Sequence, residues 1–235
     1  MRLDIYLTKN FDIQSRNKAH EIIKSKKVKV DGITITKPSF IVNEDSKIEL
    51  LEEDFYVSRA AYKLKYFLNE IKINLSSLKG LDIGSSTGGF TQILLESNIK
   101  NVTCVDVGSN QLHEKIKNDK RIIFFENQDI RTFTSENKFD VITCDVSFIS
   151  ILNIIDDINR LAKDKIIILF KPQFEVGSNV KRDKKGVVKD KKAIVKAREK
   201  FLDQCKLLGW KLNYFAPSRL EGKDGNEEEL FYFNK

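Results

Sequence analysis

A glycine-rich turn at residues 81–90, LDIGSSTGGF, constrains the fold more than any other segment of the chain. A short apolar stretch leads into Gly84, and an amphipathic helical stretch, 90–96, follows Gly88 and Gly89. Glycine suits a turn at which the backbone must approach a ligand, because a Cβ there would collide with it. The helix after the turn presents unpaired N–H groups to whatever the turn holds. The segment therefore predicts a strand, a tight turn and a helix that form a site for a nucleotide-like cofactor.

The spacing of these glycines, together with a nearby carboxylate, indicates which cofactor is expected. The pattern G-x-x-x-G-G differs from the G-x-G-x-x-G of dinucleotide binders, and it lacks the lysine of phosphate-binding loops. Residues 102–107 predict a second strand that ends in Asp106, whose carboxylate can accept two hydrogen bonds from a ribose diol. Both features favour S-adenosylmethionine over NAD or ATP. A plain tight turn without a ligand is the alternative.

The remainder of the chain predicts an α/β fold in which strands and helices alternate. The expected segments are helix 110–117, strand 122–125, strand 138–148, helix 151–162, strand 165–170, helix 191–207 and the C-terminal segments 210–218 and 230–234. Such alternation predicts a mostly parallel sheet that helices cover on both faces. Ligands bind outside the carboxyl ends of the strands in these sheets. Asp106, Asp145 and Lys171 all fall at these ends, where we expect them to meet.

The composition argues against several other classes of protein. With 235 residues, 41% of them hydrophobic, the chain can form one large or two modest domains. No apolar run approaches the roughly 18 residues that cross a bilayer, and the first residues lack the apolar core of a signal peptide. Two histidines and three widely spaced cysteines (Cys104, Cys144, Cys205) argue against metal sites and disulfides. We therefore expect a cytoplasmic protein that binds neither a metal ion nor a membrane.

Two segments carry the positive charge of the chain, which is +7 overall. Residues 1–37 hold nine Lys and Arg against four Asp and Glu, and residues 171–200 hold eleven against four. Basic segments on an otherwise acidic chain indicate a polyanionic partner. For residues 181–200, a solvated lysine-rich surface is an equally good interpretation.

The first 52 residues predict a separate small α+β module. Two short helices, the second with Ser15 as its N-cap, precede a hairpin signal at Asp31–Gly32 and a strand within 46–52. The segments RLD, SR, V-x-V and KPS resemble those of the S-four (S4) RNA-binding domain of ribosomal proteins and pseudouridine synthases. Lys26 departs from the resemblance, because this domain usually has Gly before the V-x-V strand. The resemblance implies an RNA-binding face formed by Arg2, Arg16, Lys18, Lys27 and Lys29.

The rest of the chain resembles a family of RNA-modifying enzymes in six segments that occur in the same order. They are YVSRAAYKL (56–64), LDIGSSTGGFTQ (81–92), VDVGSNQL (105–112), CDVSFIS (144–150), KPQFEVG (171–177) and GVVKD (186–190). Together with the N-terminal module they are similar to the TlyA family, S-adenosylmethionine-dependent 2′-O-methyltransferases of ribosomal RNA related to FtsJ/RrmJ. The resemblance implies an S4-type domain over 1–52, a linker over 53–56 and a Rossmann-like methyltransferase domain over 57–235.

The length of the chain implies a narrower expectation within this family. It lacks a long C-terminal extension and so resembles the shorter subgroup, which modifies a cytidine of 23S rRNA and not the small-subunit site. The expected partner is therefore ribosomal RNA or the large ribosomal subunit. Members of the family have also carried the label haemolysin.

The resemblance also implies which residues form the site. The catalytic tetrad matches Lys63, Asp145, Lys171 and Glu228. Glu228 lies in a run of three acids, so Glu227 and Glu229 stay as alternatives. The residues implied to bind the cofactor are Gly84, Ser86, Gly88, Gly89, Phe90, Asp106, Asp129 and Asp145. Asp129 stands where close relatives often have Asn.

Methyl transfer from a sulfonium to a ribose hydroxyl explains these residue types. Positioning the two reactants can lower the activation barrier by roughly 7–11 kcal/mol. The hydroxyl is nevertheless a poor nucleophile until its proton leaves. A lysine with a pKa of about 10.4 is mostly protonated at neutral pH; burial or a second ammonium lowers that pKa, and a carboxylate raises it. We hypothesise that Lys171 steers and deprotonates the 2′-OH while Lys63 and the two acids hold it in place.

Other interpretations remain open for the chain and for its single residues. A non-catalytic rRNA-docking factor and a haemolysin are the alternative functions. Taken alone, Lys63 also suits a surface helix and Asp145 a helix cap. The aromatic residues Tyr56, Phe90, Phe148 and Phe174 are expected to pack in the core or the cleft, with stacking on a flipped base as the alternative.

Overall fold

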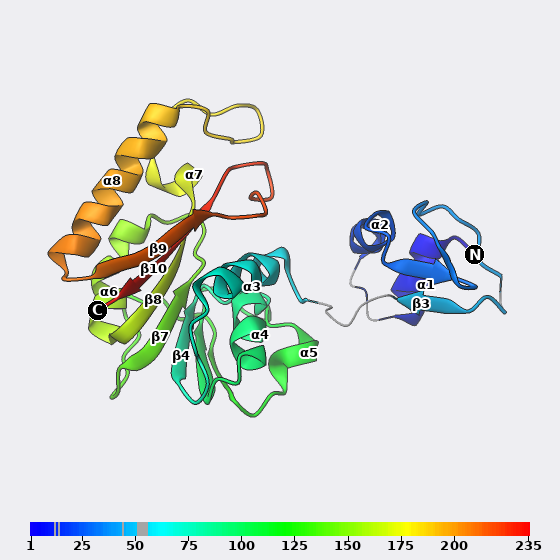
Figure 1. Ribbon diagram of the computed structural model, residues 1–235, viewed down its shortest axis with the longest axis horizontal. Helices are drawn as coiled ribbons and strands as arrows, with labels where there is room; N and C mark the ends of the chain where they lie inside the picture. The colour runs from blue at the N-terminus through cyan, green and yellow to red at the C-terminus, as the bar shows by residue number, and fades with distance from the viewer. Residues whose placement is uncertain (12, 14, 44, 51–55) are drawn as a thin grey trace. The chain divides into compact units, whose positions relative to one another are not determined.

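The computed structural model describes residues 1–11, 13, 15–43, 45–50 and 56–235, and the chain divides into two compact units, Met1–Phe55 and Tyr56–Lys235 (Figure 1). Of the expected linker, residues 53–55 lie outside the described residues. Its last residue, Tyr56, is buried beside Leu64 and Phe90. Tyr56 therefore belongs to the core of the larger unit.

The smaller unit packs two helices against a short antiparallel sheet of order β2-β1-β3. Its elements are α1 (Leu3–Asn10), α2 (Arg16–Lys24), β1 (Val28–Val30), β2 (Ile33–Thr34) and β3 (Ile48–Leu50). Ser15 caps α2 as predicted, because its hydroxyl oxygen accepts a hydrogen bond from the backbone N–H of Lys18 (3.2 Å). Apolar side chains of both helices and of β1, among them Leu7, Ile23 and Val28, form the core.

Lys26, between α2 and β1, adopts a left-handed conformation with φ = 62°. This region is unfavourable for residues with a Cβ, which gives a physical reason for the glycine that the resemblance leads one to expect at the position. Asp31 and Gly32 also have positive φ angles, 51° and 80°, in the turn that joins β1 to β2. That pair of angles is typical of a two-residue hairpin turn and confirms the Asp-Gly signal.

The larger unit is built on a seven-stranded sheet of order β6-β5-β4-β7-β8-β10-β9. The strands are β4 (Lys79–Ile83), β5 (Asn101–Val105), β6 (Ile122–Phe125), β7 (Phe139–Cys144), β8 (Ala162–Phe170), β9 (Lys211–Pro217) and β10 (Glu229–Asn234). Strands β4 to β8 are parallel, whereas β10 pairs antiparallel with both β8 and β9. The expected α/β fold with a mostly parallel sheet is confirmed.

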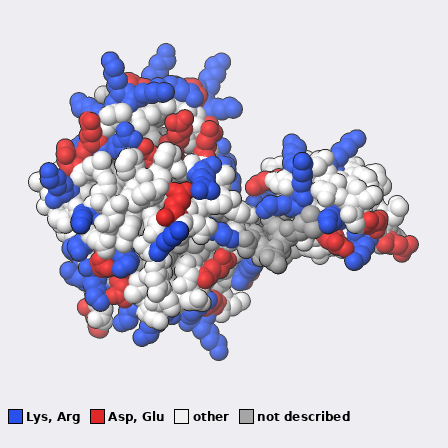
Figure 2. All heavy atoms as spheres, in the orientation of Figure 1, with Lys and Arg blue, Asp and Glu red and all other residues white. Residues whose placement is uncertain are grey.

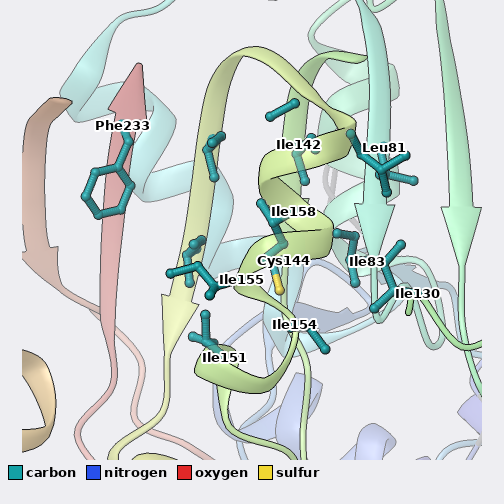
Figure 3. Packing of buried hydrophobic residues seen from close by; sticks show 14 of the residues in the cluster. Leu81, Ile83, Ile130, Ile142, Cys144, Ile151, Ile154, Ile155, Ile158 and Phe233 are labelled. Carbon is teal, nitrogen blue, oxygen red and sulfur yellow. The ribbon is translucent and has the colours of Figure 1, made fainter. Parts of the chain in front are cut away.

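Helices cover both faces of this sheet (Figure 1). They are α3 (Arg59–Ile71), α4 (Gly89–Glu96), α5 (Glu114–Lys117), the 3-10 helix η1 (Ile151–Asn153), α6 (Ile155–Leu161), α7 (Pro172–Glu175) and α8 (Lys191–Leu207). Side chains of α6 and α8 pack on one face, where Figure 3 shows Ile155 and Ile158 in the same buried cluster as Ile142 and Cys144. Side chains of α3 and α4 pack on the other face.

The apolar run at the end of β8 serves both faces at once. Ile166, Ile168 and Phe170 contact the cluster under α6 and α8, and Ile167 and Leu169 contact the cluster under α3 and α4. Alternation of side chains along a strand explains this division. A continuous apolar run is the pattern expected for a central strand that is buried on both sides.

Two predicted helices are shorter than the sequence indicates. The segment 110–117 is helical only from Glu114, because Asn110 adopts a left-handed conformation (φ = 53°) and His113 caps the helix. The segment 151–162 divides at Ile154 into η1 and α6. Both differences lie at the rim of the sheet, where the loops form the site.

Candidate active site

The glycine turn joins β4 to α4 in a conformation that requires glycine. Gly84 has φ = 74°, and a Cβ there would lie 2.9 Å from the backbone oxygen of Asp145. Gly88 has φ = 89° and is the N-cap of α4. The turn therefore brings β4 and the end of β7 closer together than a side chain would permit.

Asp106, directly after β5, holds the glycine turn in place. Its Oδ2 accepts a hydrogen bond from the backbone N–H of Ser86 (2.8 Å), and its Oδ1 accepts one from Gly108 (2.7 Å). A carboxylate has about four acceptor sites, so two stay available for hydroxyl groups of a ligand. The carboxylate thus combines a structural role with the ribose-binding role that the sequence predicts.

Two adjoining cavities lie along this turn. The glycine-turn cavity, about 340 Å³, is lined mainly by apolar side chains together with Gly84, Ser86, Asp106, Asp129 and Asp145. The small cavity, about 170 Å³, is lined by Gly84, Ser86, Gly89, Phe90, Asp145 and Lys171 among others. Seven of the eight residues implied to bind the cofactor therefore line one or both cavities, and Gly88 shapes the turn behind them.

Asp129 lines the glycine-turn cavity, but its carboxylate already has a partner. Arg131 Nη2 donates to Asp129 Oδ2 at 2.6 Å, and Arg131 Nε bonds both carboxylate oxygens. This guanidinium holds the pKa of Asp129 below its usual value. A ligand that binds Asp129 must share the carboxylate with Arg131.

Lys171 and Asp145 form a close pair at the carboxyl ends of neighbouring strands. Asp145 follows β7 and Lys171 follows β8, and their Nζ and Oδ1 atoms are 2.5 Å apart. Lys171 Nζ also donates a hydrogen bond to Ser147 Oγ at 2.9 Å. Ser147 was not singled out from the sequence, although it lies in the segment CDVSFIS. Because β7 and β8 are parallel neighbours, the sheet brings these three side chains together.

Lys63 and Glu228 form a second, more deeply buried pair. Lys63 projects from α3, and its Nζ lies 2.5 Å from Glu228 Oε2; the two side chains are only 8% and 3% exposed. Gln173 Nε2 donates to the other carboxylate oxygen at 3.4 Å. Lys63 is thus not a surface helical lysine, because it compensates a buried carboxylate.

The geometry distinguishes the three consecutive glutamates. Glu227 is exposed, and Glu229 pairs with Arg198 of α8 at 2.5 Å. Only Glu228 points to Lys63 and lines a cavity with it. Side chains of successive residues alternate in extended chain, which explains why one of the three acids faces the site.

A larger cavity of about 700 Å³, here called the basic cavity, meets the two cavities of the glycine turn. Ser147 lines all three cavities, and Lys171 lines both the small and the basic cavity. The charged residues that line the basic cavity are Arg59, Lys63, Lys171, Arg182, Lys185, Lys223, Asp224 and Glu228. Six cations against two carboxylates make this cavity suitable for an anionic ligand.

Phe148 stands at the rim between the glycine-turn cavity and the basic cavity. Its side chain is 92% exposed and its φ is 66°, a conformation that is unfavourable for a bulky residue. The ring contacts Phe174 (5.3 Å between centroids). Of the four aromatic residues considered from the sequence, Tyr56 and Phe90 are buried as expected, whereas Phe148 is not packed in a core.

Asp82 of β4 is a fully buried carboxylate below the site. Its two oxygens accept hydrogen bonds from Thr91 Oγ1 (2.6 Å) and Thr143 Oγ1 (2.8 Å). Burial raises the pKa of Asp82 to about 6, although the hydrogen bonds from these two hydroxyls lower it in part. Asp82 was not singled out from the sequence.

The raised pKa of Asp82 predicts a pH-dependent contribution to stability. Because the folded pKa exceeds the unfolded value of about 3.9, the folded state binds the proton more tightly, and stability rises as pH falls from about 6 to about 4. Above pH 6 the buried charge costs about 3 kcal/mol. Asp82→Asn keeps hydrogen bonds to both threonines and removes this charge. Urea unfolding should show that the variant is at least as stable as the wild type at pH 7.5. From pH 7.5 to pH 4.5, the variant should gain less stability than the wild type gains. A variant that loses several kcal/mol at pH 7.5 would contradict this account.

The predicted RNA-binding residues of the smaller unit gather in part around Asp4. This carboxylate is fully buried and accepts hydrogen bonds from Arg2 (3.0 Å) and Arg16 (2.8 Å), and His20 Nε2 lies 2.8 Å away. The guanidinium groups lower the pKa of Asp4. Asp4 therefore orients Arg2 and Arg16, whose side chains remain 41% and 56% exposed.

The other three predicted RNA-binding residues have different surroundings. Lys18 pairs with Glu21 on α2 at 3.3 Å. Lys29 lies on β1 opposite Thr34 and Glu49, and Lys27 directly precedes that strand. Asp4, which orients the two arginines, was missed from the sequence because an acid is not expected to support an RNA-binding face.

The described residues contain neither a membrane-spanning helix nor a cluster of metal-ligating side chains. No helix in the described part of the chain is long and apolar enough to cross a membrane. Within the same residues, no group of three His, Cys, Asp or Glu side chains could hold a metal ion. The three cysteines are buried and unpaired.

Comparison with known proteins identifies both units. Residues 56–235 match the FtsJ-like methyltransferase family, and residues 1–48 match the S4 domain. The protein of Campylobacter jejuni named 23S rRNA (cytidine-2′-O)-methyltransferase TlyA is 48% identical, and the match covers 100% of both chains. The protein of Mycobacterium tuberculosis named 16S/23S rRNA (cytidine-2′-O)-methyltransferase TlyA is 33% identical over 98% of this chain and 88% of its own length.

A solved structure gives the same result for the fold. A Streptococcus thermophilus protein that bears the name hemolysin superposes with a TM-score of 0.74 at 29% identity, covering 100% of this chain and 88% of its own. The resemblance noted in the sequence is therefore confirmed over both units. The chain belongs to the TlyA family of FtsJ-like methyltransferases and carries an S4 domain at its N-terminal end.

Proposed function

We propose that this protein transfers a methyl group from S-adenosylmethionine to the 2′-oxygen of a cytidine ribose in 23S ribosomal RNA. The observation that carries the proposal is two lysine–carboxylate contacts: Lys171–Asp145, whose lysine lines both the small and the basic cavity, and Lys63–Glu228 in the wall of the basic cavity. The name of the Campylobacter jejuni relative supports the choice of reaction and target.

The residues around the glycine turn fit S-adenosylmethionine. Asp106 offers acceptor sites to ribose hydroxyls. Ile130 and Ile154 provide an apolar wall that suits adenine. The carboxylate of Asp145 lines both cavities and suits the positive charge of the cofactor. When bound, the cofactor supplies an activated methyl group, since a sulfonium is a strong methyl donor.

Lys171 is the residue that acts on the acceptor hydroxyl in this proposal. Asp145 and Ser147 hold its amine on two sides, and Lys171 lines both the small and the basic cavity. When unprotonated, the Lys171 amine would accept the proton of the 2′-OH as that oxygen takes the methyl group and the bond between the methyl group and the sulfur of the bound cofactor breaks. Lys63 and Glu228 neutralise each other in the adjoining wall and keep the charge of the site balanced.

The substrate nucleotide enters through the basic cavity in this proposal. The excess of cations there suits the phosphates on either side of the target ribose. Arg2 and Arg16 of the S4 unit supply further affinity for the phosphate backbone. The protein thereby binds rRNA with its basic surfaces and selects one ribose with its cavity.

Phe148 is expected to stack on a nucleobase beside the basic cavity. Its ring is exposed at the rim in a strained conformation, and stacking on an aromatic side chain is worth about 1–3 kcal/mol per base. Phe148→Ala should therefore lower kcat/KM for rRNA about 10- to 100-fold, measured by methyl transfer. Binding of S-adenosylhomocysteine, measured by calorimetry, should change little. Phe148→Tyr, which keeps the ring, should retain activity; equal activity of the Ala variant would contradict the stacking role.

The proposal is tested by transfer of labelled methyl groups to 23S rRNA, to large subunits and to small subunits as the control. Label at the 2′-oxygen of one cytidine in the large-subunit substrates is the expected result. Label on the small subunit alone would overturn the proposed target. Binding of S-adenosylmethionine without label on any of the three substrates would favour a docking factor without turnover.

A further inference from the structure

The segment 181–196, here called the lysine loop, concentrates positive charge on one surface of the larger unit. It covers the later part of the connection between α7 and α8 together with the first turns of α8. It contains eight Lys and Arg against two Asp. Figure 2 shows basic side chains gathered where Figure 1 places the loop before α8 and the beginning of α8. Charge alone does not distinguish a solvated surface from a binding site. The structure of the lysine loop is needed to decide between the two.

The two acids of the lysine loop are used inside the loop itself. Asp183 Oδ1 accepts hydrogen bonds from the backbone N–H groups of Lys185 (2.8 Å) and Val187 (3.0 Å). Asp190 caps α8 by accepting from the backbone N–H of Ala193 (3.0 Å). Lys189 Nζ lies 4.0 Å from Asp183 Oδ2. The backbone of the loop thus holds both carboxylates in place, and their two negative charges balance only part of the eight positive charges of the loop.

Most lysines of the loop have no carboxylate partner in the described part of the chain. The six exposed lysines without an ion pair to a described residue are Lys181, Lys184, Lys185, Lys191, Lys192 and Lys196. A solvated surface usually mixes charges of both signs. A cluster of one sign without partners has the charge distribution expected at a nucleic-acid contact.

The backbone of the lysine loop is held in a defined conformation. The guanidinium of Arg182 donates hydrogen bonds to the backbone carbonyls of Gln173 (2.9 Å), Gly177 (3.0 Å) and Val180 (2.8 Å). Arg182 also pairs with Val188 in an antiparallel bridge. An ordered backbone holds the lysines in position before the partner binds, which lowers the entropic cost of binding.

The lysine loop is joined directly to the site. Asn226, which is buried, accepts a hydrogen bond from the backbone N–H of Val188 (3.0 Å) and lies two residues before Glu228. Lys185 and Gly186 line the basic cavity. A polyanion that binds the loop therefore reaches the mouth of the cavity that contains Lys171.

We propose that the lysine loop is a second RNA-binding surface, which binds the phosphate backbone adjoining the target nucleotide independently of the S4 unit. This inference rests on the proposed function for its partner, and it extends that function by assigning RNA contacts to the catalytic unit. Each phosphate contact releases counterions, so the logarithm of the affinity changes with the logarithm of the salt concentration by about 0.7–0.9 per contact.

The test replaces Lys181, Lys184, Lys191 and Lys192, which are exposed and line none of the three cavities, together by Gln. A matched control replaces four exposed lysines of the same unit outside the loop and the cavities, Lys100, Lys120, Lys206 and Lys211, by Gln. Both variants lose the same net charge. We measure binding to 23S rRNA from 50 to 300 mM KCl, together with KM and kcat for methyl transfer and the affinity for S-adenosylhomocysteine.

The loop variant should bind rRNA at least tenfold more weakly than the control at 100 mM KCl, with a shallower salt dependence. Its KM for rRNA should rise, whereas cofactor affinity and kcat at saturating rRNA should stay near those of the wild type. Equal salt dependence of the loop and control variants would overturn the second surface. Loss of binding to vesicles of anionic phospholipid with unchanged rRNA binding would assign the loop to a membrane instead. Absence of rRNA methylation by the wild type would contradict the proposed function. This outcome can be told apart from the two preceding ones, because they concern binding by the variants.

Discussion

Replacing Lys171 by Ala is expected to abolish most methyl transfer, by about 10²- to 10⁴-fold in kcat, the range that proton transfer by a positioned side chain contributes. The variant loses the amine that Asp145 and Ser147 hold between the small and the basic cavity. Single-turnover transfer of labelled methyl groups to large-subunit rRNA measures the chemical step. Affinity for S-adenosylhomocysteine should stay within a few-fold of the wild type, because Asp106 and the glycine turn are unchanged. A variant with full turnover would remove Lys171 from the reaction.

Lys171→Arg separates the two roles assigned to this lysine. A guanidinium keeps the positive charge that pairs with Asp145 and can donate a hydrogen bond to Ser147, but it does not give up its proton in proteins. If Lys171 only steers the 2′-OH, the Arg variant should keep a measurable part of the activity that the Ala variant loses. Equal loss in both variants is the result expected for a base.

Replacing Lys63 by Met is expected to lower the free energy of unfolding by about 3–5 kcal/mol, because it leaves the carboxylate of Glu228 buried without its cation. Both side chains are almost inaccessible, and their charged atoms are 2.5 Å apart. Among the residues that the structure describes, only Gln173, at 3.4 Å, would still donate a side-chain hydrogen bond to the Glu228 carboxylate. Urea denaturation followed by circular dichroism measures the change.

Two further variants show whether the effect comes from the unpaired charge. The double variant Lys63→Met with Glu228→Gln should recover most of the lost stability without recovering methyl transfer, since no net charge stays buried. Lys163→Met removes an exposed partner of Asp140 and should cost less than about 1 kcal/mol. A Lys63 variant no less stable than the Lys163 variant would show that Glu228 is solvated or protonated in the folded protein.

The segments around the cofactor could be predicted because local physical rules decide them. Gly84 and Gly88 adopt the positive φ angles that only glycine adopts easily, and Asp106 follows a strand because a run of apolar residues ends there. The parallel order of β4 to β8 then places the ends of the strands at one edge, so Asp145 and Lys171 meet as expected.

The residues around Lys63 could not be predicted from local pattern. An amphipathic helix that contains a lysine is typical of the protein surface. In α3, however, this lysine contacts Glu228, which lies 165 residues further along the chain. The antiparallel β10 supplies that acid beside β8, and the register of pairing chooses Glu228 over its neighbours. Similarly, the strained, exposed ring of Phe148 follows from the turn after β7, which no periodicity indicates.

The sequence by itself determined the two-unit organisation, the α/β class and the glycine turn, since these depend on contacts between near neighbours. The four residues of the tetrad were implied by the resemblance to a family. Only the tertiary structure decided which acid pairs with Lys63, that Arg131 already occupies Asp129, and that the acids of the lysine loop bind its own backbone. The reason is that burial and ion pairing depend on groups far apart in the chain. Their positions are set by strand order and register, which a sequence pattern does not contain.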